Sequence, residues 1–318
     1  MARATLSSRL LTAVAVTVAV LATGTPAMAA TSGRARVFVS GDAQHVEFVA
    51  GTGKANQVEI FRSGNTVTVD DRHRIRTGKG CTAVKGDVTK VRCAIRSTGQ
   101  VTVDVRLGDR NDVFANKTAL YADVRGGTGR DRLYGGTGTD SLNGDQGADK
   151  IYGGEGDDFL RGGALPGGDL LQGGIGDDTL LGSSGDDHLN GGDGDDLVFP
   201  GAGKDFTWAG DGDDTILDAE GNDTVDAGFG DDRVSGGPGA DSLYGAEGDD
   251  RLHGGTGADR LFGDDGDDLL NGSVDRAGGS DYDTAADSLD GGAHTTGDTA
   301  EVRPNDTTAN CEIVTAVP

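Results

Sequence analysis

The sequence predicts an all-β fold: a parallel β-solenoid of nine-residue repeats, preceded by a small β-rich N-terminal domain. A nine-residue unit recurs sixteen times between residues 126 and 271, and a fixed short period is the signature of stacked repeats. Residues 34–106 instead alternate β-branched and polar residues, as β-strands do. The 57 glycines and an aromatic content of only 5% disfavour an ordinary globular core.

The first residues have the pattern of a removable export signal. Arg3 and Arg9 form a basic start, an apolar run follows from Leu10 to Ala22, and Ala27-Met28-Ala29 fits a small-x-small cleavage site. The run is shorter than the roughly 20 residues that span a bilayer, so a membrane anchor is the weaker interpretation. We therefore expect residues 1–29 to be a signal peptide and the mature chain to be secreted, extracellular and without a membrane span.

Residues 30–107 are expected to form the small β-rich domain. The runs ARVFVS, HVEFVA, QVEIFRS, TVTVDD, TKVRCAI and QVTVDVRL are separated by turns rich in Gly, Asn and Asp. Because exported proteins can form disulfides, Cys81 and Cys93 are expected to pair across the turn at Lys85-Gly86-Asp87, a cross-link that contributes on the order of 3 kcal/mol. Cys311 is then either a shielded thiol or half of an intermolecular bridge.

The repeat runs from GGTGRDRLY at 126–134 to GDDGDDLLN at 263–271, with a two-residue insertion near Ala164-Leu165-Pro166. Its fourth place is always Gly and its sixth always Asp, whereas its eighth is aliphatic in every unit except the one with Thr207. The first six places are expected to be loop, because glycine accepts positive φ, and the last three a very short strand. Two units per coil would stack these strands into two parallel sheets across a thin core.

The ends of the array are less regular. LGDRNDVF at 107–114 resembles a worn unit, so the solenoid is assigned to residues 108–271. Beyond residue 271 the register decays, although Asp287-Ser288-Leu289 recovers half a unit. Terminal repeats of solenoids are atypical because they must cover an open end, and residues 272–318 are therefore expected to be a C-terminal cap.

The repeats carry the negative charge of the protein. Residues 126–271 hold 34 Asp and Glu against 8 Lys and Arg, whereas the rest of the chain holds 19 against 20. This sign disfavours nucleic acid and anionic membranes as partners and favours cations. Stacked coils about 4.8 Å apart would place Asp178 beside Asp196 and Asp187 beside Asp205. Like charges this close oppose folding unless a cation lies between them.

Calcium is the cation that suits such a site. It accepts six to eight carboxylate and carbonyl oxygens, whereas Mg²⁺ demands a stricter geometry and keeps its water. Sixteen units give 14 same-side neighbour pairs, and 14 Ca²⁺ would bring +28 against the −26 of the array. The fifth-place aspartates, such as Asp177 and Asp195, are expected to be solvated, with only their backbone carbonyls available to a cation.

The predicted metal ligands are the sixth-place carboxylates and the turn carbonyls near the fourth-place glycines. The aspartates are Asp131, Asp140, Asp149, Asp158, Asp169, Asp178, Asp187, Asp196, Asp205, Asp214, Asp223, Asp232, Asp241, Asp250, Asp259 and Asp268. The glycines are Gly129, Gly138, Gly147, Gly156, Gly176, Gly185, Gly194, Gly203, Gly212, Gly221, Gly230, Gly239, Gly248, Gly257 and Gly266.

These units resemble the RTX (repeats-in-toxin) nonapeptide GGxGxDxUx, a calcium-binding repeat. The resemblance covers residues 126–271, and the flanking LGDRND and PNDTTANCEIV are similar to those of small secreted bacterial calcium-binding proteins of this type. It implies a parallel β-roll with Ca²⁺ in its turns. Many RTX proteins are exported through a dedicated channel by a C-terminal signal, whereas this chain has an N-terminal one.

The sequence shows no catalytic motif. It contains neither H-E-x-x-H nor G-x-S-x-G, and GTGKAN at 51–56 lacks the spacing of a phosphate loop and is expected to be a turn. The five histidines are scattered: His45, His73, His188, His253 and His294. The ninth-place aromatics could form a sugar-binding stripe, although exposed strand aromatics are the simpler account: Tyr134, Tyr152, Phe199, Trp208, Tyr244 and Phe262.

The sequence therefore predicts a secreted, non-enzymatic protein that binds multiple Ca²⁺ between stacked turns and folds on binding. The alternative is an extracellular adhesion or cell-surface interaction module. In that case the calcium-rigidified roll is a spacer, residues 30–107 are the binding head and the ligand is unknown. A hydrolase within the N-terminal domain is a more distant alternative.

Overall fold

The structure, a computed structural model, describes residues 34–41, 43–96, 100–163, 167–273, 287–292, 299–302, 306–311 and 313–316. The predicted signal peptide, the insertion at 164–166 and much of the predicted C-terminal cap lie outside these ranges. Every regular element in the described ranges is a β-strand, which confirms the all-β prediction. Among the residues that the structure describes, no helix has the length and apolarity that a membrane span requires.

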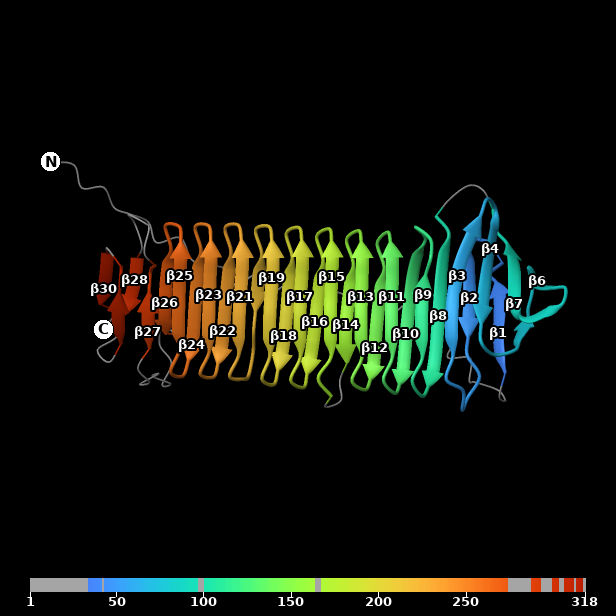
Figure 1. Ribbon diagram of the computed structural model, residues 1–318, viewed down its shortest axis with the longest axis horizontal. Helices are drawn as coiled ribbons and strands as arrows, with labels where there is room; N and C mark the ends of the chain where they lie inside the picture. The colour runs from blue at the N-terminus through green and yellow to red at the C-terminus, as the bar shows by residue number, and fades with distance from the viewer. Residues whose placement is uncertain are drawn as a thin grey trace.

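The described strands form two long sheets, here named sheet A and sheet B, that run the length of a rod (Figure 1). Sheet A contains, in spatial order, β5 (Ile75–Thr77), β1 (Ala35–Val39), β2 (His45–Val49), β8 (Thr102–Asp109), β10 (Tyr121–Thr128), β12 (Ser141–Gln146), β14 (Phe159–Gly163), β16 (Thr179–Ser184), β18 (Leu197–Ala202), β20 (Thr215–Leu217), β22 (Arg233–Pro238), β24 (Arg251–Thr256), β26 (Leu269–Ser273), β28 (Thr299–Val302) and β30 (Ile313–Ala316). Sheet B contains β6 (Cys81–Val84), β7 (Asp87–Ala94), β4 (Thr66–Asp71), β3 (Gln57–Ser63), β9 (Val113–Asn116), β11 (Arg132–Thr137), β13 (Lys150–Glu155), β15 (Leu170–Ile175), β17 (His188–Asp193), β19 (Phe206–Asp211), β21 (Thr224–Phe229), β23 (Ser242–Glu247), β25 (Arg260–Asp265), β27 (Ser288–Asp290) and β29 (Thr307–Ala309).

Each coil of the solenoid contains two repeat units, one strand in each sheet. Strands two apart in the chain pair in parallel, so that Leu180 lies opposite Val198 in sheet A and Leu171 opposite Leu189 in sheet B. The eighth-place side chains point between the sheets and are buried throughout, including Thr207. These rows form the thin core, because one apolar side chain per strand is all that each unit contributes. The predicted parallel β-roll is confirmed.

The strands are longer than the three residues that the sequence predicts. β16 covers six residues, and its pairing passes from Leu181 opposite Phe199 to Ser183 opposite Gly201, skipping the first-place residues between them. The second-place glycines bring the chain back into the sheet with a positive φ, as at Gly174 with 126°. The strand therefore continues into places one to three of the following unit, and its pairing is interrupted at the first place.

The N-terminal strands continue both sheets without a break. β1 with β2, and β3 with β4, pair antiparallel, whereas β2 pairs in parallel with β8 and β3 with β9. β8 spans the predicted boundary between residues 107 and 108. A disulfide joins Cys81 to Cys93, with an S–S distance of 2.08 Å, and links β6 to β7 at the end of sheet B. The N-terminal strands thus cover the first coil of the solenoid.

Candidate metal centre

Two ladders of aspartates run along the solenoid. Each sixth-place aspartate stands just before a strand and accepts a hydrogen bond at Oδ1 from the backbone N–H of its counterpart one coil earlier, at 2.7 Å from Asp178 N to Asp196 Oδ1 and from Asp187 N to Asp205 Oδ1. One ladder precedes the strands of sheet A: Asp140, Asp158, Asp178, Asp196, Asp214, Asp232, Asp250 and Asp268. The other precedes those of sheet B: Asp131, Asp149, Asp169, Asp187, Asp205, Asp223, Asp241 and Asp259.

The second carboxylate oxygen is left without a donor. In fourteen of these aspartates Oδ2 is buried and has no hydrogen-bond partner: Asp131, Asp140, Asp149, Asp158, Asp169, Asp178, Asp187, Asp196, Asp205, Asp214, Asp223, Asp232, Asp241 and Asp250. A buried acceptor without a donor costs about 1–3 kcal/mol, and more when it is charged. Such a regular pattern of unsatisfied anionic oxygens fits a cation ligated by each turn.

In units whose first place is glycine, a backbone carbonyl of the next coil lies near this oxygen. A Cβ added to the first-place Gly236 would lie 2.6 Å from Asp241 Oδ2 and 2.7 Å from the carbonyl oxygen of Gly254 in the next coil. A buried carboxylate oxygen and a backbone carbonyl oxygen therefore lie close together beside the first place, and both are the hard oxygen ligands that Ca²⁺ accepts. The residues present fit Ca²⁺.

The first-place carbonyls were missed by the sequence analysis, which assigned the turn carbonyls to the neighbourhood of the fourth-place glycines. Those glycines stack directly on one another: a Cβ on Gly185 would lie 3.0 Å from the Gly167 carbonyl oxygen of the preceding coil. Their carbonyls are thus directed along the rod axis toward the next coil. The fourth place must be glycine because a side chain would collide with this carbonyl.

Burial controls the protonation of the ladders. It raises the pKa of Asp196 to about 8, and the carboxylates of Asp214 and Asp178 add to the effect. Burial likewise raises the pKa of Asp232 to about 8. A backbone N–H bond opposes the rise in each case without cancelling it. The sequence predicts that repulsion between like charges opposes folding of the unliganded ladders, whereas desolvation of each carboxylate is the larger cause of the raised pKa.

The fifth-place aspartates form a separate, exposed set. Asp177 Oδ1 accepts from Asp195 N at 3.1 Å, and Asp195 Oδ1 accepts from Asp213 N at 2.9 Å. Asn222 does the same for the N–H of Ala240 at 2.9 Å. Because an amide serves equally well, this bond stabilises the turn without requiring a charge. Sequence reasoning missed the interaction, although Asn in place of Asp was a signal for it.

Three aspartates that the sequence analysis did not assign also lie at ladder positions or beside them. Asp112 N donates to Asp131 Oδ1 at 2.7 Å, and Asp259 N donates to Asp287 Oδ1 at 3.0 Å, so the sheet B ladder extends at both ends. Asp112 and Asp287 both lie in degenerate units that are recognisable in the sequence. The third, Asp218, occupies the first place of its unit, where the repeat pattern gives no reason to look for a ligand.

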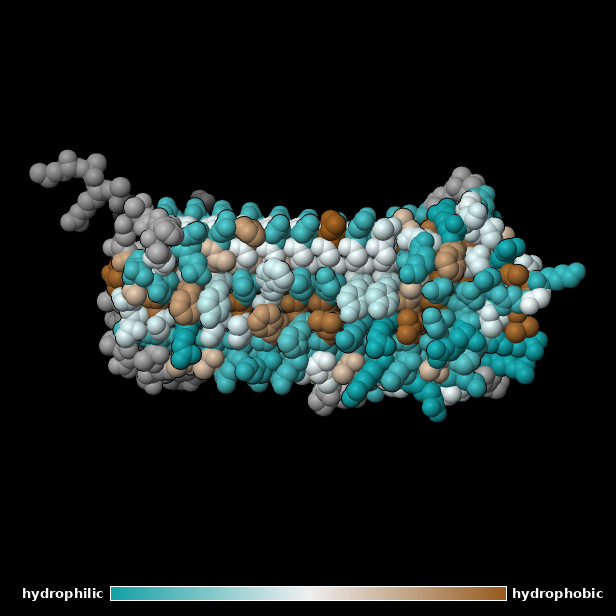
Figure 2. All heavy atoms as spheres, in the orientation of Figure 1, coloured by the Kyte–Doolittle hydropathy of each residue, from teal (hydrophilic) through white to brown (hydrophobic). Residues whose placement is uncertain are grey.

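Other surface features offer weaker sites. Figure 2 shows a largely hydrophilic surface with apolar side chains along the mid-line of one long face. Five of the six ninth-place aromatics lie in sheet B, but Phe199 lies in sheet A. Tyr134 stacks on Tyr152 with ring centroids 4.9 Å apart, and Tyr244 stacks on Phe262 at 4.8 Å. Rings that stack on each other stabilise neighbouring strands and leave less ring surface for a sugar.

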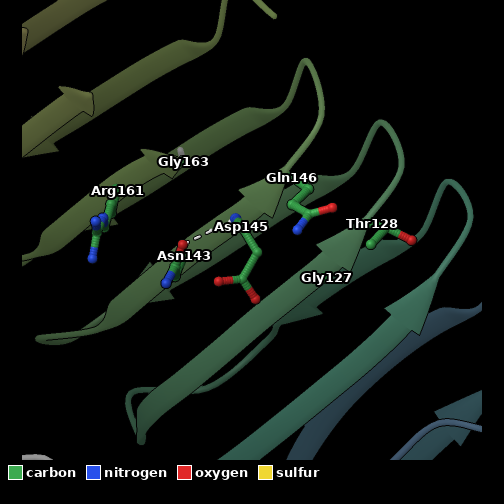
Figure 3. Close-up of a pocket in the computed structure, with 7 residues that line it drawn as sticks. All are labelled: Gly127, Thr128, Asn143, Asp145, Gln146, Arg161 and Gly163. Atoms are coloured by element: carbon green, nitrogen blue, oxygen red, sulfur yellow. Dashed lines mark hydrogen bonds between the residues drawn. The ribbon is translucent and has the colours of Figure 1, made fainter. Parts of the chain in front are cut away.

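A pocket of about 320 Å³ opens on the outer face of sheet A (Figure 3). Its polar side chains include Asp145, Arg161 and Asn143, and Asn143 Oδ1 accepts from Asp145 N at 2.9 Å. Asp145 is the one carboxylate among the seven lining residues, which contain neither histidine nor cysteine. The pocket offers hydrogen bonds to a small polar molecule.

The fold and the two ladders define a metal-binding parallel β-roll. The chain matches the RTX calcium-binding nonapeptide repeat family over residues 123–151, 134–164, 167–206, 208–243 and 244–276. The repeat array of this protein therefore belongs to that family, which confirms the resemblance drawn from the sequence. No curated protein matches the chain.

Proposed function

We propose that this protein is a secreted calcium-binding protein whose β-roll folds as Ca²⁺ enters the spaces between coils. The observation that carries the proposal is the pair of aspartate ladders, in which fourteen turns each hold one buried carboxylate oxygen without a hydrogen-bond donor. Asp241 Oδ2 and the Gly254 carbonyl illustrate the ligands that one coil and the next would supply. The cation supplies positive charge and accepts several oxygens at once; the chain orients those oxygens.

Coupling between binding and folding follows from burial. The carboxylates are exposed to water in an extended chain, but each is buried in the coil, with relative exposures of 2% at Asp196 and 0% at Asp232. Removing so many charges from water opposes folding, whereas a ligand that binds only the folded state favours it. Seven neighbour pairs in the sheet A ladder and seven among the predicted members of the sheet B ladder support about 14 ions per chain.

Circular dichroism of the full mature chain tests the coupling. The strand signal should be weak in chelator and should appear as Ca²⁺ reaches about 10⁻⁴–10⁻³ M, the range of extracellular calcium modules. Titration calorimetry should count more than ten ions, and Mg²⁺ at the same concentration should not restore the signal. Equal order in chelator, or only one or two bound ions, would contradict the proposal.

The pattern of the first residues supports secretion. A site made of cation ligands supports the proposal that the protein binds calcium without catalysing a reaction. Calcium at millimolar concentration is found outside cells, where such moderate affinities suffice. If the signal is cleaved as proposed, N-terminal sequencing of protein from the culture medium should read from near Ala30. Protein retained in the cells with residues 1–29 attached would contradict secretion.

A further inference from the structure

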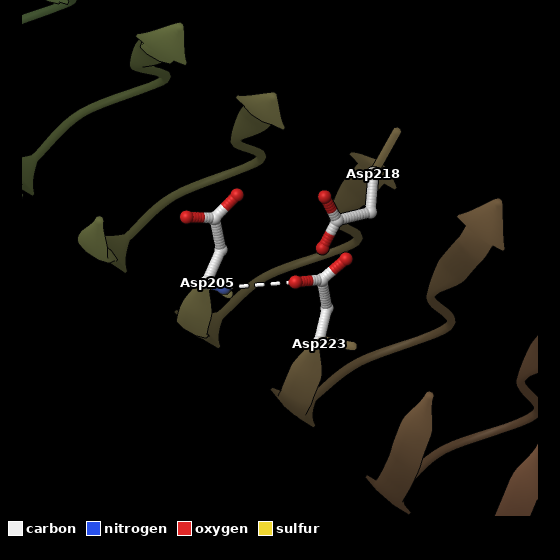
Figure 4. A group of neighbouring side chains, drawn as sticks. All are labelled: Asp205, Asp218 and Asp223. Atoms are coloured by element: carbon white, nitrogen blue, oxygen red, sulfur yellow. Dashed lines mark hydrogen bonds between the residues drawn. The ribbon is translucent and has the colours of Figure 1, made fainter. Parts of the chain in front are cut away.

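Asp218 departs from the repeat at a place that matters for the site. The first place of the other fifteen units is Gly, Ala or Pro, and this place adjoins the space between the sixth-place carboxylate and the next coil. Asp218 therefore puts a third carboxylate into a space that two aspartates, Asp205 and Asp223, already border. Figure 4 shows the three carboxylates close together, two from the unit at 218–226 and one, Asp205, from the preceding coil.

The geometry of the cluster is that of a set of ligands. One carboxylate oxygen from each of Asp205, Asp218 and Asp223 lies within 4.8 Å of the other two. Asp205 and Asp223 are each only 2% exposed, and all three Oδ2 atoms are buried without a hydrogen-bond partner. In the part of the chain that the structure describes, this is the one group of three acidic, histidine or cysteine side chains close enough to share a cation.

The Oδ1 atom of each of these three carboxylates accepts a backbone hydrogen bond. Asp205 Oδ1 accepts from Asp187 N at 2.7 Å, Asp223 Oδ1 from Asp205 N at 2.8 Å, and Asp218 Oδ1 from Ala219 N at 2.9 Å. Each carboxylate is thus held by one backbone N–H and leaves its other oxygen to the shared space. The three side chains are oriented before any ligand arrives.

The strand is shortened at this coil, although Asp218 N still donates to the Ser235 carbonyl oxygen at 2.8 Å. β20 ends at Leu217, and its register with β22 stops at Leu217 opposite Ser235, whereas β22 and β24 stay paired as far as Pro238 opposite Thr256. The second half of the strand is missing at the coil where Asp218 enters. The second place of this unit is Ala219, where most units have a glycine with positive φ.

We propose that Asp205, Asp218 and Asp223 form one cation site that binds Ca²⁺ more tightly than the other inter-coil spaces and fills first. The inference rests on the proposed function and extends it to one site with three carboxylates in place of two. Affinity for Ca²⁺ rises with the number of charged ligands and with the rigidity of the site. The same charge should favour a trivalent lanthanide still more strongly, since the Coulomb attraction grows with cation charge.

Calcium calorimetry on the full mature chain tests the proposal with two variants. The wild type should show one ion bound about tenfold or more tightly than the rest. Asp218→Asn, which removes the charge and keeps the size, should lose this tight class. Asp218→Gly, which restores the common residue of the repeat, should convert the tight ion into an ordinary one and leave the total number of ions unchanged. Glu220→Gln, an exposed charge change in the same turn, should keep the tight class.

Terbium gives a local readout of the same site. Trp208 is the only tryptophan of the chain and lies three residues after Asp205, in β19. The first equivalent of Tb³⁺ should give tryptophan-sensitised luminescence in the wild type and in Glu220→Gln, whereas Asp218→Asn should need about tenfold more Tb³⁺. Trp208→Phe should abolish the signal without changing the calcium count.

The outcomes separate the inference from the function on which it rests. Binding of many ions in a single class that is indifferent to Asp218 would overturn the inference and leave the proposed function intact. A gain of one ion in Asp218→Gly would also overturn it, because the Asp218 side chain would then fill the space itself. Failure of the wild type and of every variant to bind Ca²⁺ would instead refute the proposed function.

Discussion

Each sixth-place aspartate uses its two carboxylate oxygens for different purposes. At Asp196, Oδ1 accepts the N–H of Asp178 and joins two coils, whereas Oδ2 is buried and faces a space suited to a cation. The neighbouring Asp195 is exposed and makes only the coil-to-coil hydrogen bond. Both residues thus join neighbouring coils by one hydrogen bond, and burial of the second oxygen decides which of them can serve as a ligand.

Asp196→Asn should separate these two purposes. The amide oxygen can keep the bond to Asp178 N, but the charge that would hold a cation is lost. The calcium concentration at half-folding should rise, and the ions beside residue 196 should bind about tenfold or more weakly, as expected for a lost charge-assisted contact. In chelator the same variant should be slightly more ordered, because a buried charge has been removed.

Asp195→Asn is the matched control. It makes the same chemical change one residue away, on an exposed side chain whose bond an amide can replace, as Asn222 shows. Circular dichroism across a calcium titration should leave its midpoint within twofold of the wild type. Equal shifts for the two variants would mean that general charge reduction, rather than ligation, controls folding.

At the scale of the strand, the row of eighth-place side chains holds the sheets together. In sheet B this row passes from Leu189 to Thr207 to Val225. Thr207 is 0% exposed, and its hydroxyl is buried without a hydrogen-bond partner. Such a hydroxyl in an apolar row weakens the core, because its hydrogen bonds to water are lost on folding and not replaced.

Thr207→Val should therefore stabilise the roll by about 1 kcal/mol or more, the cost of an unsatisfied buried polar group. Denaturant unfolding in saturating Ca²⁺ measures the change. Thr224→Val, in the neighbouring strand β21 but half-buried on the outer side, should change the free energy of unfolding by less than about 0.5 kcal/mol. A loss of stability in Thr207→Val would show that the hydroxyl has a partner after all.

At the scale of the whole molecule, charge sets the conditions under which the rod forms. Burial raises the pKa of several ladder aspartates well above the ordinary value of 3.8, to about 8 at Asp158 and about 7 at Asp214. The calcium-free folded state therefore binds more protons than the unfolded state. Their contribution to folding is fully present below pH 3.8, where they are protonated in both states, and is lost as the pH rises from there through the folded-state pKa of about 7 to 8.

The calcium-free chain should accordingly be more ordered at pH 5 than at pH 8. With saturating Ca²⁺ the chain should be at least as ordered at pH 8 as at pH 5, because the cation requires ionised carboxylates. Circular dichroism in metal-free buffer at both pH values measures this. If salt at pH 8 restores order as well as acid does, screening of exposed charges is the cause, and the assignment to the buried ladders is wrong.

The two-unit coil could be predicted from the repeat alone. A nine-residue period with one apolar place per unit allows only a short strand per unit, and stacking is the only way for such strands to bury Leu180 and its equivalents. The invariant sixth-place Asp identified the ladder members for the same reason: a position that never varies while its neighbour does must meet a steric or chemical demand. The parallel sheets and their two-unit coils were predictable on this basis.

Which oxygen atoms meet depends on the packing of one coil against the next. The first-place carbonyls, the interruption of pairing at the first place and the continuation of both sheets through β2 and β3 depend on how one coil lies against the next. The same holds for Asp218, whose approach to Asp205 crosses from one coil to its neighbour. A nine-residue pattern records what every unit shares, whereas a contact between coils depends on the φ of individual glycines and on residues that depart from the pattern.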